Sequence, residues 1–294
     1  MWRDAVGTAL SWGVGSLDRW EGRLADLRRT TAFARGRLLF RPRPDDVYVA
    51  TYPRSGTTWM QFMLHLLVRG PDVEFEHIND VCPWFERSLA VGSMTPEQLE
   101  QLPSPRIFKT HMPRSWLPSV GSFVAIVRDP ADVALSYYRL YRSYLGFRGS
   151  LDDFLVRFEQ GRVQYGSYWT HVRQWQKHAN SAGVVVLRYE QLREDPAGQL
   201  RRVATMAGLP HDDPRIAAAV EGASLPRMKA LEARFDHATS LLLERGVTPR
   251  TFIGHGVVGA GAQRLSEAQR ARIEAAAGRA PREHAPWHLP SFLH

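Results

Sequence analysis

The chain has 294 residues, of which 44% are hydrophobic and 23% charged; these are the proportions of an ordinary globular protein, and they exclude a collagenous, coiled-coil or disordered chain. Its 38 basic and 30 acidic residues give a net charge of +8, which favours an anionic ligand or surface over a basic partner. The single cysteine, Cys82, excludes a disulfide framework, and no apolar run reaches the roughly 18 residues of a membrane-spanning helix, so we expect a soluble, cytoplasmic protein.

The first 44 residues differ from the rest of the chain. Residues 1–44 combine helical spacing of apolar side chains with many arginines. This pattern predicts a basic helical extension that packs on the following domain, 45–294. Contact of the extension with a membrane is the less favoured alternative, since a basic amphipathic helix can also lie on anionic lipid.

Short apolar runs and helical patterns alternate along the rest of the chain. The runs predict β-strands at DVYVAT (46–51), RIFKTH (106–111), SFVAIVR (122–128) and GVVVLRY (183–189). Apolar spacing predicts helices at 57–70, 130–144, 168–179 and 195–208, whereas the proline-rich residues 71–104 predict a loop-rich segment. Alternating strands and helices predict a single α/β domain with a central, mainly parallel sheet flanked by helices.

The first strand is followed by a turn that is suited to binding phosphate. The turn, PRSGTT (53–58), leads directly into a helix, and backbone N–H groups at a helix start converge on an anion. Gly56 permits close approach, Arg54 adds a positive charge, and three side chains add hydroxyl donors, namely Ser55, Thr57 and Thr58. The alternative is that these residues only cap the helix. The Lys-Ser/Thr pair of nucleotide triphosphatases is missing.

A second candidate phosphate site follows the strand at 122–128. Arg128 ends that strand, and Ser136 lies about two turns into the next helix. Ligands of open α/β sheets bind at the carboxyl ends of strands, so both side chains are placed to bind a second phosphate. A local ion pair between Arg128 and Asp129 is the alternative.

Lys109 and His111 are candidates for catalysis. They lie two residues apart in an extended segment, so their side chains point to the same face. Histidine suits general-base work near neutral pH, because its ordinary pKa of about 6.5 is close to operating conditions. A structural histidine is the alternative at this position.

These segments resemble the motifs of the soluble sulfotransferases that use 3′-phosphoadenosine 5′-phosphosulfate (PAPS). TYPRSGTTW (51–59) is similar to the family's 5′-phosphosulfate loop, with Arg54 in place of the usual lysine. VRDPADVALSYY (127–138) matches the fixed positions of its 3′-phosphate motif, R-x-P-x-D-x-x-x-S-x-Y, and FKTHMP (108–113) is similar to its K-[ST]-H-x-P motif. The resemblance extends over most of the chain, from about residue 46 to residue 269.

The resemblance implies the family's phosphate-binding α/β fold and its reaction, the transfer of a sulfuryl group from PAPS to a hydroxyl of a small, hydrophobic or aromatic acceptor. It implies that His111 is the general base and that Lys109 contacts the transferring group. Trp59 would stack on the adenine. The residues that it implies for binding PAPS are Arg54, Ser55, Gly56, Thr57, Thr58, Trp59, Arg128, Ser136, Tyr189, Ser224, Met228 and Gly256.

Two departures from the family pattern concern cofactor affinity and dimerisation. The family has R-K-G where this chain has GHG (254–256), so we expect compensation from Arg250, Arg264 or a protonated His255. Ala262 replaces the lysine of the family's K-x-x-x-T-V dimer motif, so the oligomeric state is not predicted.

Aromatic residues gather in two segments that are expected to face the acceptor. One is CPWF (82–85), and the other carries Tyr137, Tyr138, Tyr141 and Tyr144. They predict an aromatic wall for a hydrophobic alcohol or phenol; the equally weighted alternative is that they complete the core.

Two other functions remain open from the sequence. A small-molecule or nucleotide kinase could use the same strand, turn and helix, but it needs a magnesium site that the chain does not display. A non-catalytic anion-binding or membrane-binding protein could use the basic surface alone. No nucleic-acid-binding motif accompanies the charge, and no metal-ligand cluster is evident, so neither partner is expected.

Overall fold

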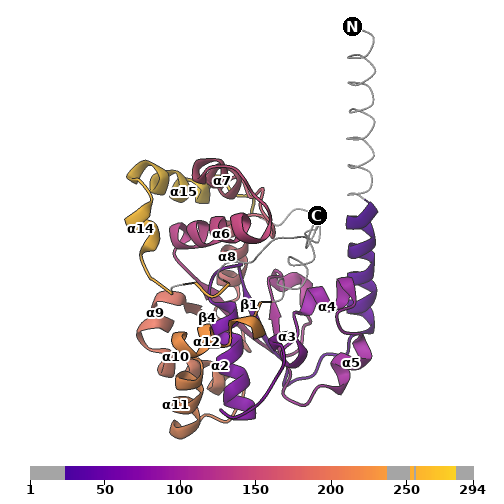
Figure 1. Ribbon diagram of the computed structural model, residues 1–294. Helices are drawn as coiled ribbons and strands as arrows, with labels where there is room; N and C mark the ends of the chain where they lie inside the picture. Colours follow the sequence, from indigo (N-terminus) through magenta and orange to yellow (C-terminus); the bar gives the residue numbers. More distant parts are fainter. Residues whose placement is uncertain (1–23, 237–251, 255, 283–294) are drawn as a thin grey trace.

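The computed structural model describes residues 24–236, 252–254 and 256–282 of this protein. A four-stranded parallel sheet lies at the centre of the described part (Figure 1). Its strand order is β2-β1-β3-β4, with bounds β1 (Val47–Thr51), β2 (Ile107–Thr110), β3 (Ser122–Val127) and β4 (Val184–Arg188). The predicted strands and the single α/β domain are therefore confirmed.

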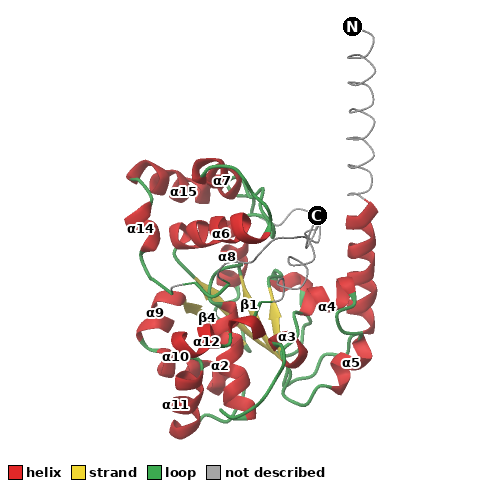
Figure 2. Ribbon diagram, in the orientation of Figure 1, coloured by secondary structure: helices red, strands yellow, loops and turns green. Residues whose placement is uncertain are grey.

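Helices surround the sheet and are drawn in red in Figure 2. Beyond a helical segment at 24–39, they are α2 (Thr57–Arg69), α3 (Ile78–Val81), α4 (Phe85–Val91), α5 (Pro96–Gln101), η1 (Arg114–Trp116), α6 (Pro130–Tyr144), α7 (Leu151–Glu159), α8 (Tyr168–Lys177), α9 (Tyr189–Glu194), α10 (Pro196–Met206), α11 (Asp213–Gly222), α12 (Leu225–Ala230), η2 (Glu232–Arg234), α14 (Ala260–Arg264) and α15 (Glu267–Arg279). The four predicted helices are confirmed as α2, α6, α8 and α10.

The prediction of a loop-rich segment at 71–104 is wrong in part. Three short helices, α3, α4 and α5, lie there. Pro96 occupies the first turn of α5, and Thr95 caps this helix through a reciprocal capping box with Gln98. Proline is compatible with the first turn of a helix, since the N–H that it lacks would have no partner there. Pro96, one of the prolines that suggested a loop, therefore marks the start of a helix.

The strands are buried on both faces because alternate residues enter different hydrophobic clusters. Val47 and Val49 of β1 pack toward α2, whereas Tyr48 faces the other side of the sheet. There the ring of Tyr48 stacks between Phe108 of β2 and Phe123 of β3, with 5.1 Å between ring centroids in each pair. Burial on both faces explains why the strands are continuous apolar runs.

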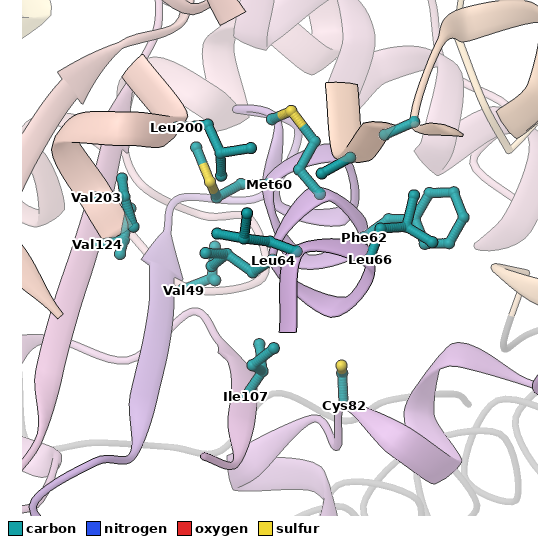
Figure 3. Close-up of a cluster of buried hydrophobic side chains, with 14 of the residues drawn as sticks. Val49, Met60, Phe62, Leu64, Leu66, Cys82, Ile107, Val124, Leu200 and Val203 are labelled. Carbon is teal, nitrogen blue, oxygen red and sulfur yellow. The ribbon is translucent and has the colours of Figure 1, made fainter. Parts of the chain in front are cut away.

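Helix α2 fixes the phosphate-binding turn to the sheet. Met60 and Leu64 of this helix lie among Val49 and Val124 of the sheet and Leu200 of α10 (Figure 3). All five side chains are fully buried. Packing of this kind holds the amino end of α2 at the carboxyl end of β1, which is where the candidate site lies.

A buried ion pair joins the opposite, amino ends of β1 and β2. Arg106 donates from Nε and Nη2 to the two carboxylate oxygens of Asp46, at 2.7 Å each. Both side chains are inaccessible to solvent. Arg106 also donates to the carbonyl of Leu99, and Tyr48 donates its hydroxyl to Asp46. The pair is thus part of a satisfied hydrogen-bond network.

We expect Asp46→Asn to lower the free energy of unfolding by about 3–5 kcal/mol, because it leaves the guanidinium of Arg106 buried without its counter-charge. Urea unfolding measures the change. Asp213→Asn is the matched control, since its pair with Arg201 lies at the surface and should contribute at most about 1 kcal/mol. Equal losses in both variants would contradict the assignment of the buried pair as the main structural ion pair.

The described part of the amino-terminal extension contacts the domain. Phe33 and Phe40 are buried against Phe85, and Arg37 donates to the carbonyls of Trp116 and Leu117. The division into 1–44 and 45–294 stays a prediction. None of the helices in the described ranges combines the length and the apolar character that crossing a bilayer requires.

Candidate functional site

The carboxyl ends of all four strands border one cavity of about 510 Å³. Pro53 follows β1, His111 follows β2, Arg128 follows β3 and Tyr189 follows β4, and each of them lines the cavity. A parallel sheet brings these ends to a single edge, so segments distant in sequence meet there. The two candidate phosphate sites and the Lys-x-His segment are thereby brought together.

The turn before α2 leaves the amino end of this helix open toward the cavity. Gly56 is the N-cap residue, and no side chain caps the helix. The buried hydroxyl of Ser55 makes no hydrogen bond within the described residues, and Thr57 pairs its hydroxyl with that of Thr51. The helix-cap alternative for this turn therefore finds no support. A helix amino end with free N–H groups attracts an anion.

Gly56 is required by the close approach of α9 to the turn. Its φ angle is 99°, in the left-handed region that favours glycine. A Cβ atom at this position would lie 2.8 Å from Cδ2 of Tyr189. The glycine therefore lets the aromatic ring of Tyr189 approach the phosphate-binding turn.

Arg54 connects the turn to the second candidate phosphate site. Its Nε donates to the hydroxyl of Ser136 at 3.0 Å, and its Nη2 donates to the carbonyl of Phe252 at 3.3 Å. Arg128 in turn donates to the carbonyl of Arg54 at 3.2 Å. Burial lowers the pKa of Arg54, and the nearby positive charge of Arg128 lowers it further. An anion bound between the two arginines would offset both the cost of burial and the repulsion between the two charges.

Asp132 organises the second site from the first turn of α6. It accepts from Arg128 at 3.3 Å and from the backbone N–H groups of Gly259 and Gly261 at 3.0 and 2.7 Å. The alternative pair between Arg128 and Asp129 is not formed, because Asp129 caps α6 by accepting from the N–H of Asp132. One carboxylate thus positions both an arginine and the amino end of α14.

Aromatic rings border the cavity beyond the turn. Trp59 and Tyr189 meet edge to face with their centroids 6.2 Å apart, and the indole N–H of Trp59 donates to the carbonyl of Ala223 at 3.0 Å. The guanidinium of Arg128 lies 4.3 Å from the ring centre of Tyr189, and that of Arg193 lies 5.4 Å from Trp59. A flat, aromatic ligand group fits such surroundings.

His111 has a defined tautomer. Its Nδ1 lies 2.7 Å from the carbonyl oxygen of Thr51, which can only accept, so Nδ1 carries the proton and Nε2 keeps its lone pair. Trp84 and Tyr165 meet the imidazole edge to face at centroid distances of 5.3 and 4.9 Å. Burial is the main reason why the pKa of His111 lies well below its ordinary value, and the positive charge of Lys109 lowers it further. The imidazole is therefore neutral at neutral pH.

Lys109 lies beside this histidine, as their spacing predicts. Both line the cavity, and the ammonium group of Lys109 lies 3.9 Å from the ring centre of Trp84. Burial lowers the pKa of Lys109 to about 7, although the carboxylate of Glu86 opposes this shift. Glu86 itself is fully buried and accepts from the backbone N–H of His111 at 2.9 Å.

The cavity lining is strongly cationic. In the described part of the chain it contains one carboxylate, that of Asp132. Seven basic side chains oppose it, namely Arg54, Arg87, Lys109, Arg128, Arg139, Arg193 and Arg264. A multiply charged anion is the ligand that such a lining favours. Arg264, one of the residues expected to compensate at GHG, is among the seven, whereas Arg250 and His255 lie outside the described residues.

Most of the site residues predicted from the sequence line this cavity. Those that do are Arg54, Gly56, Thr57, Thr58, Trp59, Lys109, His111, Arg128, Ser136, Tyr189, Met228 and Gly256. Ser55, which is buried, and Ser224, the N-cap of α12, do not line the cavity. Their roles in binding or catalysis stay predictions.

The expected aromatic wall is only partly present. Trp84, Tyr137 and Tyr144 line the cavity. Phe85 instead packs in the hydrophobic core. Tyr138 and Tyr141 pack against the ring of Phe154 in α7. Sequence reasoning also missed Tyr165, a lining residue whose φ angle of 68° is unusual for a residue other than glycine.

Comparisons of this chain with known proteins match it to sulfotransferases. The family model described as a sulfotransferase domain matches residues 44–282. Sulfotransferase 1A1 of Bos taurus is 32% identical over 224 residues, which cover 70% of this chain and 76% of the bovine protein.

Solved structures show the same fold. Retinol dehydratase in complex with androsterone and the inactive cofactor PAP has a TM-score of 0.71 at 22% identity, over 86% of this chain and 84% of the other. Mouse sulfotransferase SULT7A1 complexed with PAP has a TM-score of 0.64 at 23% identity, over 85% and 88%. At these identities the likeness concerns the fold.

Proposed function

The chain belongs to the sulfotransferase family, and from this premise we propose that it transfers a sulfuryl group from PAPS to a hydroxyl of a small, aromatic or hydrophobic acceptor. The observation that carries the proposal is the meeting of three segments at one cavity. The turn at Gly56, the arginine of β3 and the Lys-x-His segment after β2 all line it. A donor with phosphates at two positions requires two separate anion sites beside a base, and this cavity provides them.

The residues present fit such a donor. The Nε of Arg128, a lining residue, is buried without a hydrogen-bond partner in the described residues, so it can donate to a phosphate. The open amino end of α2 supplies N–H groups, and Gly56 lets a ligand approach them. Trp59 and Tyr189 offer aromatic surfaces for an adenine. The two structural neighbours hold PAP, which supports this choice of donor.

His111 is the proposed general base. When bound, PAPS supplies a sulfuryl group joined to a phosphate that can leave. The acceptor oxygen forms its bond to sulfur as the bond from sulfur to the phosphate oxygen breaks, and the acceptor proton passes to Nε2 of His111. The bond from Nδ1–H to the carbonyl of Thr51 orients the ring and stabilises the imidazolium that forms.

Three groups are placed to stabilise the negative charge that grows on the leaving phosphate. They are the guanidinium of Arg54, the ammonium of Lys109 and the N–H groups at the start of α2. Ser136 and the carbonyl of Phe252 hold Arg54 before any ligand binds. Donors that are already oriented cost little reorganisation during the reaction, which is why they are effective.

The proposal is tested by incubating the purified full-length chain with PAPS and a panel of phenols and alcohols. Mass spectrometry should detect a gain of about 80 daltons in an acceptor, and calorimetry should show tighter binding of PAP than of ATP. Magnesium-dependent consumption of ATP would instead favour the kinase. Binding of neither nucleotide would favour the non-catalytic alternative.

We expect PAP binding to take up protons above pH 7. Because burial lowers the pKa of Lys109 to about 7 in the free protein, a bound polyanion raises this pKa and the complex holds more protons. Affinity should therefore fall as the pH rises above 7. Calorimetry at pH 8 in buffers of different ionisation enthalpy measures the uptake.

Lys109→Met is the variant that tests this assignment, and it should bind PAP with little proton uptake. His111 does not interfere at pH 8, because its pKa lies well below its ordinary value and the imidazole stays neutral. Uptake of equal size in both proteins would show that another group gains the proton.

A further inference from the structure

A buried glutamate beside the proposed base has no part in the transfer described above. Glu86 lies in the first turn of α4 and is inaccessible to solvent. Its Oε1 accepts a hydrogen bond from the backbone N–H of His111 at 2.9 Å. Glu86 is not among the described residues that line the cavity, so it acts on the site through its neighbours and not by contact with a ligand.

Glu86 completes the hydrogen bonding along the outer edge of β2. This strand lies at the edge of the sheet and pairs with β1 on one side. On the other side, the N–H of Lys109 donates to the carbonyl of Pro83 at 2.9 Å, and Trp84 forms a parallel bridge with Lys109. The next N–H on this edge, two residues along, is that of His111. The chain after Trp84 has already entered α4, so the side chain of Glu86 supplies the acceptor that a strand carbonyl would have supplied.

His111 is thereby held from two sides. Its Nδ1–H donates to the carbonyl of Thr51, the last residue of β1, at 2.7 Å, whereas its backbone N–H donates to Glu86 of α4. The first bond orients the ring, and the second fixes the backbone from which the ring projects. Because the ring meets the carbonyl of Thr51 only while that backbone stays in place, a shift at Glu86 would also displace the imidazole.

Glu86 also influences the charge of Lys109. Burial lowers the pKa of Lys109 to about 7, and the carboxylate of Glu86 opposes this shift. Burial raises the pKa of Glu86 itself, and the N–H of His111 opposes that rise. The reach of Glu86 to His111 and its charge beside Lys109 are therefore two separate contributions, and an experiment has to distinguish them.

We propose that Glu86 is a positioning residue for the transfer: its hydrogen bond to the backbone of His111 keeps the imidazole on the carbonyl of Thr51 and leaves Nε2 available to the acceptor. This inference rests on the proposed function, and it adds to that function a residue that touches neither donor nor acceptor. The bond itself, and not the charge of the carboxylate, is the decisive property.

Two substitutions separate reach from charge. Glu86→Gln keeps the length of the side chain and an oxygen that can accept the N–H of His111, but it removes the charge. Glu86→Asp keeps the charge but is one methylene shorter, so it withdraws the acceptor. We expect Glu86→Asp to lower kcat by about 10–100-fold, as small displacements of a reacting group do, and Glu86→Gln to retain most of the activity. The KM for PAPS should be nearly unchanged in both variants, and urea unfolding establishes that both are folded.

NMR spectroscopy of the free protein with isotope-labelled histidine tests the positioning without any turnover. The wild type should show His111 as the tautomer with its proton on Nδ1, in a signal that is identified by its loss in His111→Ala. Glu86→Gln should keep this signal, and Glu86→Asp should lose it or show a mixture of tautomers. Glu190→Asp is the matched control, because Glu190 also lies in the first turn of a short helix and accepts a backbone N–H at 2.9 Å, but from Asp129. It should leave the signal of His111 unchanged.

The proposal is overturned if Glu86→Gln loses as much kcat as Glu86→Asp or more, because the charge beside Lys109 would then be what matters. It is also overturned if the Nδ1–H signal of His111 is the same in Glu86→Asp as in the wild type. Transfer to no acceptor by the wild type would contradict the sulfotransferase proposal, whereas the NMR comparison would still decide whether Glu86 positions the imidazole.

Discussion

Replacing His111 by alanine is expected to lower kcat by about 10²–10⁴-fold, the range that a positioned general base contributes. The reason is geometric, because Nδ1 is engaged by the carbonyl of Thr51 and Nε2 is the nitrogen that keeps a lone pair. PAP affinity should be nearly unchanged, since the imidazole is neutral and contributes no charge to the anion sites. Steady-state kinetics and calorimetry measure the two quantities.

His178→Ala provides the comparison for this variant. His178 is the C-cap residue of α8 and does not line the cavity, so its loss should leave kcat unchanged. Urea unfolding establishes that both variants are folded. If His111→Ala turns over a verified acceptor at the wild-type rate, His111 is not the general base. If the variant loses both PAP binding and turnover, the role of His111 is structural.

Replacing Arg54 by methionine is expected to lower kcat by about 10²–10³-fold, as does the loss of one preorganised donor in other sites of charge stabilisation. The KM for PAPS should also rise, because the charge of Arg54 acts on the bound donor as well. Arg54 is half-buried, and the bonds of its guanidinium to Ser136 and Phe252 fix the orientation of that group. Initial rates at several PAPS concentrations separate the two effects.

Arg54→Lys is the matched variant, since lysine is the residue that the family usually has at this position. Lysine keeps the charge but lacks the rigid, planar set of donors with which the guanidinium holds both acceptors. We expect a loss of about tenfold or less in kcat for this variant, much smaller than for methionine. Similar losses for lysine and methionine would show that the bond to Ser136, and not the charge, is what matters.

Local patterns were sufficient to predict the sheet and the place of the site. β1 and β3 are short apolar runs because both of their faces are buried, and that leaves a clear signal in the sequence. The site then follows from topology, since the residues after each strand of a parallel sheet meet at one edge. His111 and Arg128 lie in the same cavity for this reason.

Residues that act through long-range contacts could not be predicted. Asp132 matched a motif position, but its bonds to Gly259 and Gly261 join segments more than a hundred residues apart. Glu86 reaches the backbone of His111, and nothing in its own helix signals that contact. Phe85 and Trp84 are neighbours of similar character, yet one enters the core and the other lines the cavity, because the start of α4 turns them to different sides.

The two ends of the sheet have separate tasks. The pair of Asp46 and Arg106 secures the amino ends of β1 and β2, whereas the groups proposed for binding and chemistry follow the carboxyl ends. Substitutions of side chains that line the cavity therefore leave the buried pair, at the other end of the strands, in place. Such an arrangement is evolvable: acceptor range can drift between lineages, or be redirected in the laboratory, while the framework that carries it keeps its stability.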